Sequence, residues 1–478
     1  MHPCKPSRKT KIVCTLGPAS DSSQGIRRLV DAGMNVVRLN FSHGDRDSHR
    51  EAIRRVRRVS RETGEEVGIL QDLGGPKIRL GTLPVPQREL LGGEEVVFRA
   101  GESSDSDVLP VNYPFLTEDV AMDDRILLGD GLVELVVTDK KDGEIRARVL
   151  VGGVIHSHKG VNLPLSDLRV PAFTEKDRED LKAGLEEGVD FVALSFVRNE
   201  RDIKPVREIL NRLEYPPLLI AKIEKPQAVE RLERILSRVD GVMVARGDLG
   251  VEMPLEEVPV IQKRIIHMAR QAGKPVITAT QMLRSMVSSP RPTRAEATDV
   301  ANAIFDRTDA LMLSEETAMG EYPAEAVSML DRIARSTEPY LDPQQPLKEP
   351  LPEKVSTTQV AISRSACWLA RDLDGAAVVA STSSGSTARQ VSRFRPSCPV
   401  IGFTPHLSTQ RQLTLSWGVI PVLVDHFTDT DEMLGMVRGW TRQNGIARAS
   451  DRIIITAGVP LGACGTTNLI KVLEIQEE

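Results

Sequence analysis

The stretch LLIAKIEKPQAVERLERILSRVDGVMVARGD (residues 218–248) carries the pattern on which the fold prediction rests. Both ends of the stretch are short apolar runs, and the middle has apolar residues at helical spacing. The stretch therefore predicts a strand over residues 218–223, a helix over residues 227–236 and a second strand over residues 242–245. Two buried strands joined by a crossover helix form the repeating unit of a parallel sheet.

The same strand-then-helix unit recurs along much of the chain. Eight strands are expected, over residues 12–15, 36–39, 67–70, 191–194, 218–223, 242–245, 276–279 and 310–313. The helical patterns between and after them cover residues 25–32, 50–63, 175–187, 202–213, 227–236, 258–272, 295–305 and 324–337. Eight such units predict an α/β protein with a (β/α)₈ TIM barrel, although an open doubly wound sheet would show the same local pattern.

Two departures from this pattern indicate two further domains. Residues 74–170, after the third strand, contain turns and short strands, expected over residues 94–99, 125–128, 132–138 and 145–151. The catalytic barrel would then consist of residues 1–73 and 171–345, together 248 residues, close to the roughly 250 of a typical TIM barrel. A proline-rich connector over residues 339–352 leads into residues 346–478. Strands near residues 376–380, 400–403, 419–424 and 453–456 predict that this last part is an α/β regulatory domain.

Composition excludes several classes of protein. The 478 residues include 62 Lys and Arg against 67 Asp and Glu, a net charge of −5, so nucleic acid is not an expected partner. No apolar run reaches the roughly 18 residues of a membrane span, and the N-terminus has no signal-peptide core. The five cysteines are scattered and form no C-x-x-C pair, which argues against a disulfide framework or a structural zinc site. We expect a cytoplasmic protein with about three domains and no membrane partner.

Polar side chains follow the apolar runs of seven predicted strands. They are Arg38, Asn40, Ser42, Asp72, Ser195, Lys222, Glu224, Arg246, Gly247, Asp248, Thr278, Thr280, Ser314, Glu315 and Glu316. In a TIM barrel these strand ends meet at the face where enzymes of this fold carry out their chemistry. Burying so many charges is costly unless they are paired or bind a ligand, so an internal salt-bridge network is the alternative. We expect a functional site.

The residue types at this face suit phosphoryl transfer. Glu224 and Asp248, from adjacent strands, offer carboxylate oxygens to Mg²⁺ and leave its other positions to substrate and water. Arg38 and Lys222 supply positive charge for phosphoryl oxygens, and Gly247 lets the backbone approach an anion closely. Phosphoryl transfer needs a metal, cations and positioning more than it needs a strong nucleophile on the protein.

At these segments the sequence resembles the pyruvate kinase family. The matching stretches are residues 10–19, 34–44, 75–79, 221–224, 245–250, 279–283, 292–296 and 313–320. The resemblance covers nearly the whole chain in order and is weakest across the insert. It implies transfer of the phosphoryl group from phosphoenolpyruvate to ADP, giving pyruvate and ATP, with Mg²⁺ or Mn²⁺ as cofactor.

The resemblance also implies roles for individual residues. Glu224 and Asp248 would bind Mg²⁺, and Arg38 and Lys222 would surround the transferring phosphoryl group, with Lys222 stabilising the transition state. Gly247, Asp248 and Thr280 would hold the substrate carboxylate. Thr280 and Ser314 fit a hydroxyl-and-water relay that protonates the enolate.

Nucleotide binding and a mobile lid are implied in the same way. Arg79, with Asn40 and His43, would contact the nucleotide, although from the residues alone His43 could equally have a loop or capping role. The insert would be a lid whose Asp130, in Gly129-Asp130-Gly131, closes over the site and excludes water. The same three residues are typical of a hairpin turn.

One departure from the family pattern concerns K⁺. Members that require K⁺ bind it through residues matching Asn40, Ser42 and Asp72 and the carbonyl at Leu73, and they generally carry Glu at the position of Lys77. Members that work without K⁺ carry Lys there, because a fixed ammonium can replace a bound monovalent cation. Leu73 also replaces the Thr common in the K⁺-requiring group. We expect that K⁺ is not required, although these oxygens would still let a cation bind.

The C-terminal domain contains a candidate effector site. Its hydroxyl-bearing residues follow a predicted strand and lead into a helix, where free N–H groups can hold a phosphate: Thr382, Ser383, Ser384, Ser386 and Thr387. An ordinary N-cap turn would look the same. The resemblance implies a sugar-phosphate or nucleotide activator, with residues 457–467 as the other wall. It also implies a homotetramer, and the apolar positions of a helix over residues 355–371 would suit either a subunit contact or a monomer's core.

Two other functions remain open at the level of the sequence. A Mg²⁺-dependent lyase or aldolase on a related barrel would also stabilise an enolate, or would use Lys222 as a Schiff base. A lyase or aldolase function would not account for the insert, for Arg79 or for the third domain. A non-catalytic sensor of phosphorylated metabolites has no reason to retain Lys222, Glu224, Asp248 and Thr280 together, because such residues act as a unit.

Overall fold

The computed structural model describes residues 8–104, 107–129, 131–164, 166, 168–350, 357–427, 429–459 and 467–476. Eight parallel strands close into a barrel in the order β1, β16, β15, β14, β13, β12, β3 and β2. They are β1 Lys11–Thr15, β2 Val36–Asn40, β3 Gly68–Asp72, β12 Phe191–Leu194, β13 Leu218–Ile223, β14 Gly241–Ala245, β15 Val276–Ala279 and β16 Ala310–Leu313. The predicted (β/α)₈ barrel is confirmed, and the open-sheet alternative is wrong.

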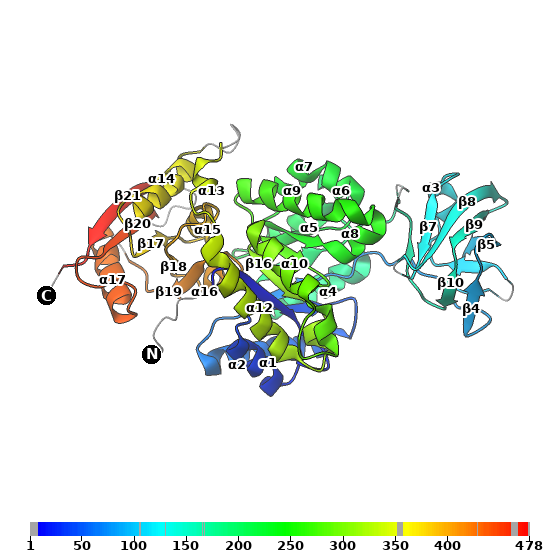
Figure 1. The fold of residues 1–478 in the computed structure, drawn as a ribbon, viewed down its shortest axis with the longest axis horizontal. Helices are drawn as coiled ribbons and strands as arrows, with labels where there is room; N and C mark the ends of the chain where they lie inside the picture. Colours follow the sequence, from blue (N-terminus) through cyan, green and yellow to red (C-terminus); the bar gives the residue numbers. More distant parts are fainter. Residues whose placement is uncertain are drawn as a thin grey trace.

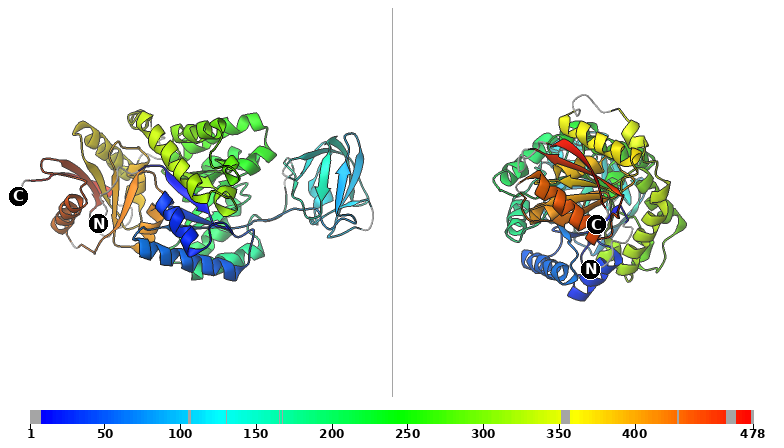
Figure 2. Two further views of the ribbon diagram at one scale, coloured as in Figure 1. Left: turned by 60° about the horizontal axis from the view of Figure 1, so that its bottom comes forward. Right: turned by 90° about the vertical axis from the view of Figure 1, so that its left-hand side faces the viewer.

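Helices surround the barrel and cover the outer face of its strands (Figures 1 and 2). They are α1 Ser23–Ala32, α2 Arg46–Thr63, α4 Glu175–Glu186, α5 Glu200–Leu210, α6 Pro226–Glu230, α7 Leu232–Leu236, α9 Val258–Gln271, α10 Arg294–Phe305 and α12 Pro323–Thr337. The continuous apolar runs of the strands follow from burial on both sides, and in β1, β3, β12, β14, β15 and β16 every residue is buried. The single helix predicted over residues 227–236 is two helices, because Arg231 at φ −101° and ψ 18° leaves the helical conformation.

The insert after β3 is a separate β-rich body, joined to the barrel by two chain segments (Figure 2). One sheet has the order β11-β7-β8-β9-β5-β6, and β10 pairs with β4. The elements are β4 Gln87–Leu90, β5 Glu95–Ala100, β6 Leu109–Val111, α3 Leu116–Asp119, β7 Arg125–Leu128, β8 Val133–Lys141, β9 Glu144–Val151, β10 Gly153–His156 and β11 Val161–Asn162. The insert has its own hydrophobic core, which includes the fully buried Phe98 and Tyr113.

The C-terminal part is an α/β sandwich at the opposite end of the barrel from the insert (Figure 1). Its sheet has the order β19-β18-β17-β20-β21, with β21 antiparallel to β20. Helices α14, α15 and α16 pack on one face and α17 on the other. The elements are α14 Thr358–Asp372, β17 Ala377–Ser381, α15 Ser386–Ser392, β18 Val400–Thr404, α16 Leu407–Leu413, β19 Val419–Leu423, α17 Thr430–Gln443, β20 Arg452–Gly458 and β21 Thr467–Glu474. The sequence analysis missed β21, although its β-branched and apolar residues are typical of a strand.

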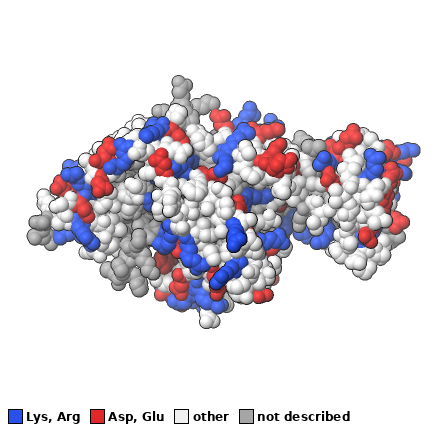
Figure 3. Space-filling view, viewed as in Figure 1, with Lys and Arg blue, Asp and Glu red and all other residues white. Residues whose placement is uncertain are grey.

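Charge and hydropathy of the folded chain agree with the composition. On the face in Figure 3, acidic and basic side chains are interspersed, and neither sign forms a continuous patch. In the described part of the chain, no helix is both long and apolar enough to cross a membrane.

Candidate active site

Side chains from three strand ends form one ion-pair network at the carboxyl end of the barrel. Arg38 on β2 donates to Asp72 at the end of β3, with Nε 2.8 Å and Nη2 2.7 Å from Oδ2. Lys222 Nζ on β13 lies between two carboxylates, 2.7 Å from Glu224 Oε1 and 3.4 Å from Asp72 Oδ1. The side chains of Asp72 and Glu224 are each only 1% exposed. The barrel therefore brings Arg38, Asp72, Lys222 and Glu224 into direct contact.

The pKa shifts in this network indicate that a further positive charge would be stabilised beside its carboxylates. Burial lowers the pKa of Lys222, but Asp72, Glu224 and Asp248 outweigh it, so the net pKa lies above its usual range. Burial raises the pKa of Glu224, Lys222 opposes this, and Asp248 raises it further. Burial also raises the pKa of Asp72, yet Lys222 and Arg38 reverse this and leave it lowered. Glu224 and Asp248 repel each other, and a divalent cation between them would offset that repulsion.

A short helix that the sequence analysis missed positions Asp248. Helix α8 (Arg246–Glu252) starts directly after β14, so Gly247 and Asp248 lie in its first turn, where backbone N–H groups have no partner within the helix. Gly247 N donates to Thr280 Oγ1 at 2.7 Å. The structure therefore places Gly247, Asp248 and Thr280 together.

Thr280 is held in a strained backbone conformation. Thr280 and Gln281 have φ values of +70° and +54°, a region that non-glycine residues rarely adopt. Arg246 clamps this turn, with Nη2 donating to Thr280 O at 2.7 Å and Nε to Ala279 O at 3.2 Å. The guanidinium in turn pairs with Asp299 of α10 at 2.7 Å. The sequence analysis assigned Arg246 no role, although a charged residue at a buried strand end was a signal.

Ser314 shares a cavity of 310 Å³ with Gly247, Asp248 and Thr280. Ser314 N donates to Glu316 Oε2 at 2.7 Å, and Leu283 N donates to the other oxygen of this buried carboxylate at 3.0 Å. Glu316 belongs to α11 (Glu315–Ala318), a second short helix absent from the prediction. Thr280 and Ser314, the two residues predicted to form the proton relay, thus line the same cavity as Asp248.

Lys77, Arg79 and His43 lie at the mouth of the site on the insert side, close to Arg38 and Lys222. Burial, followed by the charges of Arg79 and Lys222, lowers the pKa of Lys77 to about 8. Burial also lowers the pKa of the His43 imidazole, and Lys77, Arg79 and Arg38 act in the same direction. Asn112 of the insert fixes this segment by accepting from Arg79 N at 2.7 Å and donating to Lys77 O at 3.2 Å. This positive field would suit the phosphates of a nucleotide.

Several of the predicted ligand oxygens of a monovalent cation already have protein partners. Leu73 O accepts from Ser195 Oγ at 2.7 Å, and that hydroxyl accepts from Lys222 Nζ at 2.8 Å. Asn40 Oδ1 accepts from Ser42 N at 3.2 Å, and Asp72 is bound by Arg38. Among the described residues, no group of three or more His, Cys, Asp or Glu is arranged to hold a metal ion. The carboxylate pair Glu224 and Asp248 would need substrate oxygens and water to complete a coordination shell.

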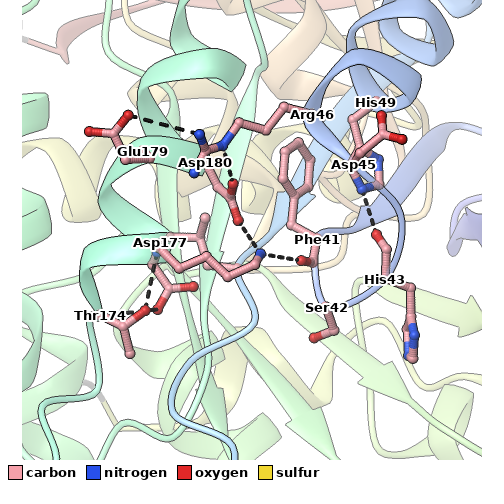
Figure 4. A network of polar contacts seen from close by, with 12 residues as sticks. Phe41, Ser42, His43, Asp45, Arg46, His49, Thr174, Asp177, Glu179 and Asp180 are labelled. Atoms are coloured by element: carbon pink, nitrogen blue, oxygen red, sulfur yellow. Dashed lines mark hydrogen bonds and ion pairs between the residues drawn. The ribbon is translucent and has the colours of Figure 1, made fainter.

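Helix α4 holds both loops that carry the residues predicted to contact the nucleotide (Figure 4). Asp177, in the capping box of this helix, accepts from Gly75 N at 3.1 Å and so fixes the segment that leads to Lys77. Lys176 Nζ donates to Phe41 O at 2.9 Å, and Asp180 accepts from Arg46 Nε at 2.8 Å. The turn that carries Ser42 and His43 is thereby tied to the same helix, with the His43 ring pointing away from these contacts (Figure 4).

Comparison with known proteins identifies the family of this chain. A model of the pyruvate kinase barrel domain matches residues 7–327, and a model of the pyruvate kinase alpha/beta domain matches residues 360–473. The chain belongs to the pyruvate kinase family. A pyruvate kinase of Geobacillus stearothermophilus is 47% identical over 474 residues, which are 98% of this chain and 81% of that protein. A pyruvate kinase of Mycobacterium intracellulare is 45% identical over 473 residues, 99% of each chain.

A solved structure agrees with this assignment. A pyruvate kinase from Cryptosporidium parvum superposes with a TM-score of 0.93 at 35% identity, over 98% of this chain and 96% of that one. These matches give no support to the lyase, aldolase or sensor alternatives.

The lid residue expected from the pyruvate kinase resemblance, Asp130, lies outside the described residues. Strands β7 and β8 pair antiparallel in a hairpin, with Leu128 opposite Val133. A Cβ on Gly131 would lie 3.8 Å from Val251 of α8, which places the tip of this hairpin beside the helix that carries Asp248.

The candidate effector loop of this chain is not an ordinary hydroxyl-capped turn. The N-cap of α15 is Gly385, at φ +77°, and no side chain caps the helix. The hydroxyls bond elsewhere: Ser386 Oγ accepts from Gln359 Nε2, and Thr387 Oγ1 pairs with Thr467 Oγ1, both at 2.7 Å. Residues 460–466, the central part of the other expected wall, lie outside the described residues.

Proposed function

We propose that this chain catalyses Mg²⁺-dependent phosphoryl transfer from phosphoenolpyruvate to ADP, with release of pyruvate and ATP. The observation that carries the proposal is Lys222 Nζ, held 2.7 Å from Glu224 and 3.4 Å from Asp72 at the carboxyl end of the barrel. This arrangement puts one fixed cation beside Glu224, one of the two carboxylates that would hold the metal ion, as phosphoryl transfer requires.

Glu224 and Asp248 are the residues that would hold Mg²⁺. Both are at the same cavity-bearing face, and Glu224 Oε1 is buried with no well-formed hydrogen bond, although Lys222 Nζ lies close to it. Hard carboxylate oxygens are suitable ligands for this ion. When bound, the ion would polarise the phosphoryl and enolate oxygens and neutralise part of their charge.

Arg38 and Lys222 would stabilise charge on the phosphoryl group during transfer. Asp72 fixes the plane of the Arg38 guanidinium, and Ser195 and the two carboxylates fix the Lys222 ammonium. Because these donors are already oriented, little reorganisation is needed when charge develops in the transition state.

Thr280 and Ser314 would deliver the proton that converts the enolate to pyruvate. Thr280 Oγ1 now donates to Ala279 O at 2.6 Å, and rotation of this hydroxyl would redirect its proton into the cavity that Ser314 also lines. A water in this cavity could complete the relay. The backbone N–H of Asp248, in the first turn of α8, would hold the substrate carboxylate, and Gly247 N would join it on releasing Thr280 Oγ1.

The reaction itself is the first test. Pyruvate should form from phosphoenolpyruvate only when ADP and Mg²⁺ are both present, measured as initial rate with each omitted in turn. Pyruvate formation without ADP would instead favour a lyase-type reaction. A folded protein that binds phosphoenolpyruvate and Mn²⁺ but produces no pyruvate under any condition would favour a sensor.

We also propose that Lys77 replaces a monovalent cation. Changing Lys77→Glu should lower the K⁺-free rate by about 10²-fold, a typical loss for one electrostatic group at a transition state, and added K⁺ should restore much of it. The wild-type rate should change less than about threefold with K⁺. The measurement is the rate in a Tris or tetramethylammonium buffer with and without KCl.

Lys182→Glu is the matched control for this variant. Lys182 is exposed on α4, so the same charge change should leave the K⁺ response unaltered. A wild-type rate that itself collapses without K⁺ would contradict the proposal.

Regulation and assembly are further parts of the proposal. The loop over residues 382–387 would bind a phosphorylated activator, and the active form would be a homotetramer in which the insert acts as a lid. The Gly385 turn supports the first point, since it leaves the N–H groups at the start of α15 uncapped by side chains.

A further inference from the structure

A second cavity lies between the barrel and the C-terminal domain, at the amino ends of the barrel strands and so opposite the active site. Its volume is 640 Å³, within the range of small-molecule sites in proteins. Arg8 and Lys9, before β1, line one side, and Arg307, before β16, lines another. Pro396 and Trp417 of the C-terminal domain complete the wall.

The cavity contains positive charge that the protein does not neutralise. Arg8 and Arg335 share Asp331, at 3.1 and 2.7 Å, and Arg395 pairs with Asp309 at 2.9 Å. The oxygens of Glu338 accept from the backbone N–H groups of Lys9 and Thr10, at 2.9 and 2.7 Å.

The two remaining cations have only neutral partners. Lys9 Nζ donates to Pro396 O at 3.0 Å, and Arg307 Nη2 donates to Asp342 O at 2.6 Å and Gln345 Oε1 at 3.0 Å. Within the described residues, neither has a carboxylate at ion-pair distance. Arg307 is buried and Lys9 is half-buried. A positive charge removed from water without a carboxylate is unfavourable unless an anion binds beside it.

Two guanidinium groups at this cavity also have unused donors. Arg307 Nη1 and Arg395 Nε are buried and have no hydrogen-bond partner in the described part of the protein. Arg307 is 5% exposed and Arg395 2%. Burial, followed by the charges of Arg270 and Arg395, lowers the pKa of Arg307 to about 10. These two nitrogens expose almost no surface, so it is the charge of the two guanidinium groups, and not these donors, that acts on the cavity.

We propose that this cavity binds the phosphate monoester of a small metabolite, with the phosphate at Lys9 and Arg307. Two unneutralised cations match the charge of a phosphate dianion better than that of a single carboxylate. The apolar wall, which includes Leu341, Trp417 and Ile420, would cover the organic part of the ligand. The site is separate from the loop over residues 382–387 and from the active site, and it does not depend on the proposed reaction.

A ligand in this position would contact both the barrel and the C-terminal domain. Arg307 and Glu338 belong to the barrel side, whereas Pro396 and Trp417 belong to the C-terminal side. Binding would therefore hold the two parts in one relative position and stabilise the folded protein by mass action.

Calorimetric titration of the full-length protein with AMP, glycerol 3-phosphate and inorganic phosphate tests the proposal. The background is Lys222→Met together with Ser384→Ala and Ser386→Ala, which weakens phosphate binding at the active site and the loop. A site should remain there, and adding Lys9→Met and Arg307→Met should weaken it at least tenfold. The organic phosphates should bind more tightly than inorganic phosphate, because only they reach the apolar wall.

Two outcomes would overturn the proposal. One is an absence of binding in the background protein up to millimolar ligand, and the other is unchanged affinity after Lys9→Met and Arg307→Met. If that pair of substitutions impairs folding, as a melting curve would show, Lys9→Met alone decides, because its ammonium contacts only carbonyl groups and one ring face. A threefold or larger loss of affinity in this single variant supports the site, and an unchanged affinity rejects it.

Discussion

Replacing Lys222 with Met should reduce kcat by about 10³-fold, because the fixed ammonium next to the transferring phosphoryl group is lost. The side chain is 12% exposed and contacts Glu224, Asp72 and Ser195, so no other described cation can take its position without moving these groups. The KM for phosphoenolpyruvate should change much less than kcat, since the charge on the phosphoryl oxygens is greatest in the transition state. Steady-state kinetics at saturating Mg²⁺ measure both parameters.

Lys225→Met provides the matched control for this experiment. Lys225 is also a buried lysine at the end of β13, but it pairs with Glu252 at 2.6 Å and lies outside the phosphoryl-binding network. Its loss leaves a buried carboxylate unpaired and should lower the melting temperature, with kcat within about threefold of wild type. Equal losses of kcat in the two variants would show that Lys222 acts through stability alone.

Glu224→Gln and Asp248→Asn should each raise the Mg²⁺ concentration for half-maximal rate by about 10²-fold, because each removes one of two charged ligands. Mn²⁺ binding, followed by electron paramagnetic resonance without substrate, should weaken in parallel. This second measurement reports on the metal site whether or not the variant turns over.

Glu316→Gln separates metal binding from general damage to the site. Glu316 is a buried carboxylate of the same face, but its oxygens accept from Leu283 N and Ser314 N. This variant should lower kcat by displacing Ser314 and keep the wild-type dependence on Mg²⁺. A Mg²⁺ dependence that shifts in Glu316→Gln but stays unchanged in Glu224→Gln would show that the metal ligands are misassigned.

Local patterns were sufficient for the strands and for most of the helices. All eight barrel strands were predicted within about two residues, because strands buried on both sides require continuous apolar runs. Helices α8 and α11 were missed, since seven and four residues are too short to show an amphipathic period. These short helices carry Asp248 and Glu316. Sequence periodicity therefore did not predict the structure of the segments that directly follow β14 and β16 and that carry site residues.

The sequence by itself determined the eight strand-and-helix units, the insert, the family and the set of polar residues at the strand ends, and only the structure decided that the eight strands close into a barrel. Periodicity and motif order are properties of neighbouring residues, so they can be read along the chain. Only the tertiary structure decided that Lys222 lies between Asp72 and Glu224, that Arg246 clamps the turn at Thr280, and that Lys9 and Arg307 meet at one cavity. Apart from Lys222 and Glu224, which are two residues apart, those pairs are separated by tens to hundreds of residues. Their contact depends on barrel closure and domain docking, which no local pattern encodes.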